Sequence, residues 1–343
     1  HGIRVPVVVG TLALCLGYVA AAMAPGLGAY TWAQGLLIGV GSAATFSPLL
    51  AHVSMWFDRR RGMAVAIFAS GNYLAGTVWP PIVQHFIASD GWRHTYLGIG
   101  ACCLATMLPL AWLLKRRAPL AASAGPAANA AAAMAGTAPV VPRTARPGAP
   151  LRISNNALQW LLVIAGVCCC TAMSMPQVHL VAYCSDLGYG PARGAQMLSL
   201  MLGCGIVSRL VFGAICDRIG GLRTLLAGAA LQGLALLMFL PFNGLVSLYL
   251  VSALFGLFQG GIVPSYAIIV REYFPAQEAG ARVGFVITAT LFGMALGGYL
   301  SGAIFDMTGS YHAAFINGIA FNLVTVSIAA WLLHRSMARP AFA

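Results

Sequence analysis

Long apolar runs and short polar breaks alternate along the chain, and most of the charged residues lie in the breaks. An α-helix needs about 20 apolar residues to cross the ~30 Å hydrocarbon core of a bilayer, and it satisfies its backbone hydrogen bonds internally. The pattern therefore predicts an all-α polytopic membrane protein. We expect ten spanning helices, at residues 5–24, 29–55, 62–87, 94–114, 156–183, 194–215, 222–241, 245–270, 282–304 and 312–333.

The composition and the placement of charge agree with a membrane protein. The chain is 60% apolar and 8% charged, with a mean hydropathy of +0.85. A net charge of +12 would suggest a nucleic-acid partner in a soluble protein, but here the basic residues gather in alternate breaks, as expected for the cytoplasmic side. We therefore expect a multi-pass protein of the cell (inner) membrane, with both ends of this sequence in the cytoplasm and no nucleic-acid partner. The basic residues of the cytoplasmic breaks are Arg4, Arg59, Arg60, Arg61, Lys115, Arg116, Arg117, Arg143, Arg146, Arg152, Arg218, Arg223, Arg271, Arg282, Arg335 and Arg339.

Residues 116–152 consist mainly of Ala, Pro, Gly and Arg and contain almost no large apolar side chain. Such a segment cannot bury enough surface to fold, so we predict a disordered cytoplasmic linker. It would separate an N-terminal bundle remnant of four spans (1–115) from a C-terminal bundle of six spans (153–343).

An internal repeat accounts for the unequal halves. Gly-Ile-Arg at 2–4 and Gly-Leu-Arg at 221–223 each precede an apolar span, and an aromatic-Phe pair, a polar stretch and a glycine-containing span recur at 56–76 and 273–297. If one unit is used twice, the first copy lacks about 67 residues, enough for two spans with their loops. We therefore expect an N-terminally truncated member of a twelve-span fold that lacks its first two spans.

A charged, glycine-rich motif lies in the short break after the sixth expected span. Its glycines permit a tight turn, and its aspartate can cap a helix end and pair with arginine. The motif predicts a conformational latch between helix ends, although a plain loop whose charges mark the cytoplasmic side remains an alternative. The latch residues are Gly213, Asp217, Arg218, Gly220 and Arg223.

This motif closely resembles the G-x-x-x-D-R-x-G-x-[RK] signature of the major facilitator superfamily, with one extra residue before the final arginine. The break at 56–64 and the segment 208–213 resemble the monocarboxylate-transporter and oxalate:formate-exchanger branch. That resemblance implies that Arg209 binds a substrate carboxylate. The chain departs from the branch at Gly205, where monocarboxylate transporters often have an aspartate, and in lacking a lysine within 282–304.

Arg209 is a permanent cation well inside an expected span. It lies eight positions before Asp217, roughly 12 Å from the expected helix end and thus near mid-membrane. None of the seven acids of the chain is placed to pair with it at that depth. We therefore predict that its counter-charge is the anionic group of a solute. The alternative is a structural arginine satisfied by carbonyl groups or by an acid in the missing spans.

Four polar residues near the middle of other spans complete the candidate substrate site: His179, Gln177, Asn72 and Gln259. His179 could bind the anion or carry a proton, because histidine titrates near neutral pH. The alternative is that these side chains only hydrogen-bond neighbouring helices.

The sequence thus predicts a secondary active transporter of a small organic anion, with a monocarboxylate as the expected substrate, that works by alternating access with a coupled proton or counter-anion. The alternative is a non-transporting, transporter-like sensor or an inactive fragment. We expect no enzyme, cofactor or metal site, because the sequence shows neither a nucleophile–base pair nor cysteine and histidine ligand spacing.

Overall fold

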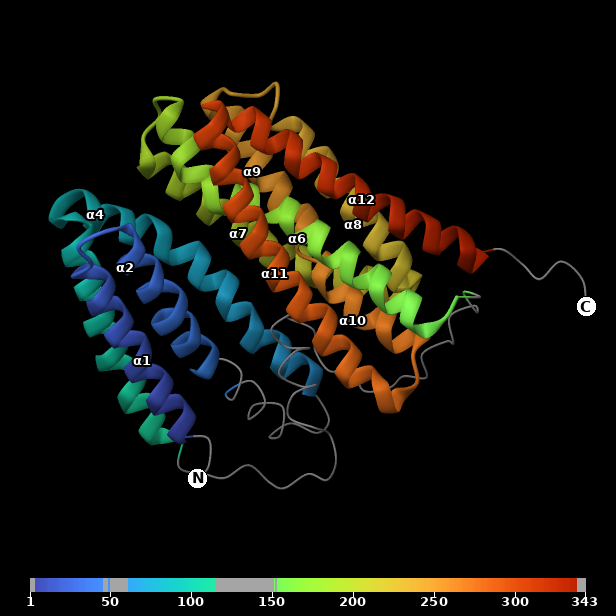
Figure 1. The fold of residues 1–343 in the computed structure, drawn as a ribbon, viewed down its shortest axis with the longest axis horizontal. Coiled ribbons are helices and arrows are strands. Elements are labelled where there is room, and N and C mark those ends of the chain that lie inside the picture. Colours follow the sequence, from blue (N-terminus) through green and yellow to red (C-terminus); the bar gives the residue numbers. More distant parts are fainter. Residues whose placement is uncertain (1–3, 46–48, 50–60, 115–150, 152, 338–343) are drawn as a thin grey trace, which may run out of the picture.

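The computed structural model describes residues 4–45, 49, 61–114, 151 and 153–337. Helices make up nearly all of this part, and they form two groups (Figure 1). The predicted linker at 116–152 and most of the break at 56–64 lie outside the described residues. The helices are α1 (Arg4–Ala22), α2 (Leu27–Trp32), the π-helix η1 (Ala33–Ile38), α4 (Arg61–Leu113), α6 (Asn155–Asp186), α7 (Pro191–Ile219), α8 (Gly221–Met238), α9 (Leu245–Gln259), α10 (Ile262–Tyr273), α11 (Ala276–Thr308) and α12 (Tyr311–Met337).

The first group contains α1, α2, η1 and α4. The helix α4 reverses at Gly91, whose backbone is non-helical (φ 81°, ψ 158°), so that its second half returns alongside α1 (Figure 1). Two arginines tie opposite ends of this group together. The Nε of Arg4 donates to the carbonyl oxygen of Leu114 at 3.0 Å, and the Nε of Arg93 donates to that of Ala22 at 3.2 Å.

Eight helices within the described residues are long and apolar enough to cross a membrane. One of them, the 44-residue stretch Ser70–Leu113, contains the turn at Gly91 and so includes both expected spans 62–87 and 94–114. The expected span 29–55 begins as α2 and η1 and remains helical to Thr45, and its remainder lies almost wholly outside the described residues. The count of ten spans and the two missing spans therefore remain predictions.

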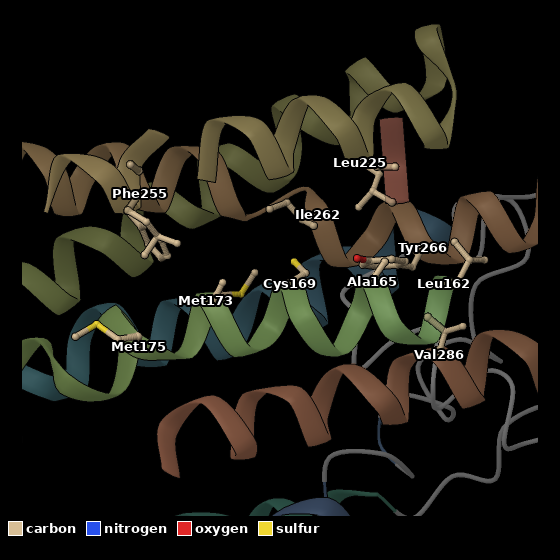
Figure 2. Packing of buried hydrophobic residues seen from close by; sticks show 14 of the residues in the cluster. Leu162, Ala165, Cys169, Met173, Met175, Leu225, Phe255, Ile262, Tyr266 and Val286 are labelled. Carbon is tan, nitrogen blue, oxygen red and sulfur yellow. The ribbon is translucent and has the colours of Figure 1, made fainter. Parts of the chain in front are cut away.

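The second group consists of α6 to α12, and α6 lies at its centre. A cluster of buried apolar side chains surrounds α6, with Cys169 and Met173 facing Phe255 of α9, Ile262 of α10 and their neighbours (Figure 2). Buried amides fasten the same helices across the group. Gln232 of α8 donates to the carbonyl oxygen of Cys169 at 3.3 Å, and Asn322 of α12 donates to that of Ala229 at 3.1 Å. Such bonds each contribute about 0.6–2 kcal/mol within a membrane.

The two groups meet where the first half of α4 lies along α7. The helices run antiparallel, with Gly76 against Leu202 and Thr77 against Gly203. A Cβ atom added at Gly203 would lie 3.3 Å from the Cγ2 of Thr77. Small residues thus bring the two backbones close together, which is how helices associate in lipid, where van der Waals packing replaces the hydrophobic effect.

This contact predicts that the double substitution Thr77→Cys and Gly203→Cys forms a disulfide, because a sulfur at the γ position of residue 77 would lie near the new Cβ. A protease site placed within 116–152 separates the two cysteines in sequence. After oxidation and cleavage, the two fragments should migrate together on a gel until a reductant is added. The native chain and each single-cysteine variant, carrying the same protease site, are the controls. Fragments that separate without reductant would show that α4 does not lie on α7 in this register.

Candidate functional site

The interface between α4 and α7 holds Arg209 against an aromatic ring. The Cζ of Arg209 lies 4.0 Å from the centroid of the Tyr73 ring, so the guanidinium covers the ring face. Its Nε is buried and has no hydrogen-bond partner among the described residues. Among the described side chains the one ion pair joins Arg282 and Glu278, so none of the described carboxylates pairs with Arg209. The cation is therefore held by a ring while part of its hydrogen-bonding capacity is unused.

Gly205, one turn before Arg209, makes room for that ring. A Cβ at Gly205 would overlap the Cε1 of Tyr73 and lie 2.7 Å from its Cδ1. An aspartate at this position, as the resembling branch often has, would collide with Tyr73. The departure noted in the sequence thus has a steric reason. Tyr73 follows Asn72 near the middle of its span, but its contact with Arg209 was not predicted from the sequence. The sequence did contain a signal for this contact: a tyrosine near the middle of one span, and a glycine one turn before the arginine of another.

The third helix of the site is interrupted at this level. The expected span 245–270 is divided into α9 and α10 at Gly260 and Gly261. The Oγ of Ser208, adjacent to Arg209, accepts a hydrogen bond at 3.1 Å from the backbone N–H of Gly260. The interruption is slight, because Gly260 and Gly261 both keep right-handed helical backbone angles and the two helices form one candidate span, Leu245–Val270. The glycine pair was the sequence signal for this break.

Gln259 is the last residue of α9 before the break and is 1% exposed. Its Oε1 accepts a hydrogen bond at 2.9 Å from the Nε2 of Gln177 on α6. Its own Nε2 is buried without a partner. An unpaired buried donor costs about 1–3 kcal/mol, and more when the group is charged. Arg209 and Gln259 thus each have a buried N–H group that has no acceptor among the described residues.

The structure brings only some of the predicted substrate residues together. Gln177 and Gln259 are directly bonded. Asn72 precedes Tyr73 on α4 and is exposed. His179 is bound elsewhere: its Nε2 lies 2.9 Å from the carbonyl oxygen of Gly298 on α11, and its ring packs near Tyr311. Because a carbonyl oxygen can only accept, this nitrogen carries the proton.

At its C-terminal end, α7 continues directly into α8 through the charged motif. Gly220 has φ 85° and ψ 166°, a backbone that favours glycine. Arg218 and Arg223 are exposed, no atom lies within 4 Å of a Cβ added at Gly213, and the Asp217 side chain lies outside the described residues. The latch therefore remains a prediction.

Glu272, near the end of α10, is a member of this region that the sequence analysis missed. Its two carboxylate oxygens accept from the backbone N–H of Gly221 at 3.1 and 3.3 Å. Gly221 is the first residue of α8, where the helix dipole favours an acid. Burial raises the pKa of the Glu272 carboxyl, and the Gly221 N–H opposes that rise. The sequence signal for this role was the position of Glu272, an acid next to Arg271 at the polar break that recurs in the internal repeat.

The family model described as the Major Facilitator Superfamily matches residues 1–251 and 197–342, which together cover almost the whole chain. The chain belongs to the major facilitator superfamily. It is 28% identical over 335 residues to monocarboxylate transporter 13 of Bos taurus, covering 97% of this chain and 74% of that protein. It is also 28% identical to monocarboxylate transporter 13 of Rattus norvegicus, over 341 residues and with the same coverage of both chains.

Solved structures of the superfamily share the fold. The transporter FucP in its outward conformation superposes with a TM-score of 0.60 at 15% identity, over 96% of this chain and 82% of that one. The human organic anion transporter MFSD10 superposes with a TM-score of 0.61 at 17% identity, over 96% and 77%. The resemblance found in the sequence is confirmed: this is a multi-pass membrane protein of a transporter family and not an enzyme.

Replacing Gly205 with alanine should destabilise the protein by about 1–3 kcal/mol, because the new methyl group overlaps the Tyr73 ring. Adding Tyr73→Ala should restore most of this loss relative to Tyr73→Ala alone. Gly213→Ala, on the same helix with no atom near its new Cβ, is the matched control and should show little loss. Thermal unfolding of the purified protein in detergent measures all four variants. Equal losses for Gly205→Ala and Gly213→Ala would contradict the packing described.

Replacing Glu272 with alanine should lower stability by about 1–2 kcal/mol, because the Gly221 N–H loses its acceptor. Glu272→Gln keeps an acceptor oxygen and should cost less. Thermal unfolding at fixed pH ranks the three proteins. An alanine variant as stable as the wild type would contradict a capping role for Glu272.

The same carboxyl should make stability depend on pH. Its pKa is higher in the folded protein than in the unfolded chain, so the folded protein binds the proton more tightly. This contribution is complete below the ordinary value of 4.5 and is lost as the pH rises through the folded-state pKa. The stability of the wild type relative to Glu272→Gln should therefore fall as the pH increases above 4.5. A difference that stays constant or grows over this range would contradict this prediction.

Proposed function

We propose that this protein is a secondary active transporter of a small organic anion, with a monocarboxylate as substrate, and that Arg209 binds the carboxylate during alternating access. The observation that carries the proposal is the buried, unpartnered Nε of a permanent cation in the middle of a span. A carboxylate would supply the missing acceptor and the missing charge, and guanidinium groups bind carboxylates through paired parallel hydrogen bonds.

The neighbouring residues support an anion more than a cation or a neutral solute. The other unpartnered group at the helix break, the Nε2 of Gln259, is also a donor. Gln177 keeps the Gln259 amide in this orientation through its own hydrogen bond. Asn72 is proposed as a further polar group on the first bundle. The chain is also 28% identical to a protein named monocarboxylate transporter 13, which agrees with this substrate class.

Energy coupling requires a group other than Arg209, because a guanidinium does not release its proton. His179 is the proposed candidate, since its neutral ring would still offer Nδ1 as a proton acceptor while Nε2 remains bonded to Gly298. Exchange of one anion for another is the alternative. Rocking of the two bundles would expose the site to either side in turn. Gly213, Asp217, Arg218, Gly220 and Arg223 would form the latch at the cytoplasmic ends, with Glu272 holding α8.

The proposal predicts uptake of carboxylates by the full chain in proteoliposomes. The panel is formate, acetate, lactate, pyruvate, oxalate and benzoate, with lactamide as an uncharged analogue of lactate. Uptake of at least one carboxylate and none of lactamide is the expected result. Binding without uptake would favour a transporter-like sensor, and the absence of both would contradict the anion site.

Arg209→Gln should reduce uptake of the active carboxylate by at least ~30-fold, because truncating one partner of a buried charge pair costs about 2–5 kcal/mol. Arg209→Lys keeps the charge but not the paired hydrogen bonds and should retain partial activity. The matched control is Arg193→Gln, on the same helix but exposed and bonded to Gln196. Arg193→Gln should leave uptake unchanged. Equal activity of Arg209→Gln and the wild type would exclude Arg209 as the anion site.

A further inference from the structure

We propose that Tyr73 is a positioning residue for the anion site: its ring holds the guanidinium of Arg209 so that the edge of this cation faces the substrate. This inference rests on the proposed function. It assigns a role in substrate binding to a residue of the first bundle, whereas Arg209 belongs to the second.

The geometry of the pair indicates that Tyr73 supports binding of the anion to Arg209 and does not compete with it. The Cζ of Arg209 lies over the Tyr73 ring, 4.0 Å from its centroid. A carboxylate binds in the plane of a guanidinium, through N–H groups at its edge, so a ring on the guanidinium face leaves those groups open to the anion. Holding a long side chain in its bound orientation removes part of the entropy cost of binding. Tyr73 should therefore raise the affinity for the anion.

The position of the ring is itself fixed by close packing. The ring lies on Gly205, where a Cβ would overlap it, and the hydroxyl group of Thr77 donates to the carbonyl oxygen of Tyr73 at 2.7 Å. One helical turn further along α4, Gly76 meets Leu202 of α7. The ring thus reaches Arg209 only while α4 lies against α7. The orientation of Arg209, and therefore the affinity for the anion, should depend on this contact between the bundles.

The test varies the electron density of the ring while its shape is nearly constant. Tyr73→Phe, and monofluoro- and trifluorophenylalanine placed at the same position, weaken the attraction of the ring face for a cation in steps. Tyr73→Leu removes the attraction and keeps an apolar side chain. The dissociation constant of the full chain is measured by titration calorimetry for the carboxylate of the panel that the wild type binds most tightly. The same fluorinated series at Phe86, on α4 beside His85, is the control.

The expected result is near wild-type affinity for Tyr73→Phe, a stepwise loss with fluorination, and about 2- to 13-fold weaker binding for Tyr73→Leu, which corresponds to the usual cost of immobilising one long side chain on binding. The Phe86 series should be flat. An affinity that does not change with fluorination, or that increases in Tyr73→Leu, overturns the inference while the carboxylate site at Arg209 stands. If the wild type binds no member of the panel, the proposed function fails and the inference fails with it.

Discussion

A guanidinium within the apolar interior keeps its charge, and the arrangement of the neighbouring helices depends on how that charge is held. Insertion of an arginine at the centre of a span costs about 2.5–3.5 kcal/mol even on the mildest scales. Arg209 recovers part of this cost from the face of Tyr73. Its buried Nε has no hydrogen-bond acceptor in the part of the chain that the structure describes. An uncompensated donor of this kind is expensive in a structural role and useful in a binding role, which is why the proposed function is built on it.

Close approach of backbones makes this arrangement possible. Gly205 admits the Tyr73 ring from α4, and Gly256 and Gly260 let α9 approach α7 closely, because a Cβ at either position would overlap main-chain or side-chain atoms of α7. Larger residues would separate the three helices and leave Arg209 in a cavity or in lipid. The same closeness turns the N–H of Gly260 toward Ser208 and ends α9 beside Gln259. The close packing of the helices and the positions of the polar groups at the site therefore both result from these glycines.

The helix α7 connects two regions of interest. Arg209 lies in its interior, and its C-terminal end carries the motif that passes through Gly220 into α8. There Glu272 of α10 fixes the first N–H of α8, while α10 itself begins just after the break beside Arg209. In the proposed rocking of the two bundles, the contact that would change is the one between α4 and α7, because these helices belong to different groups and carry Tyr73 and Arg209.

The sequence by itself determined the membrane class, most of the spans and the superfamily, because hydrophobic length, charge placement and the motif at 213–223 are local properties of the chain. It also singled out Arg209, whose role in binding remains a proposal. It did not reveal the contact of Tyr73 with Arg209, the break at Gly260 and Gly261, or the role of Glu272. Nor did it show that His179 bonds to α11 while Gln177 bonds to Gln259. Two residues on one helix can face different neighbours, and an aromatic ring meets a cation 136 positions away only when two helices pack in one register. Such pairings depend on three-dimensional contact, and only the tertiary structure decided them.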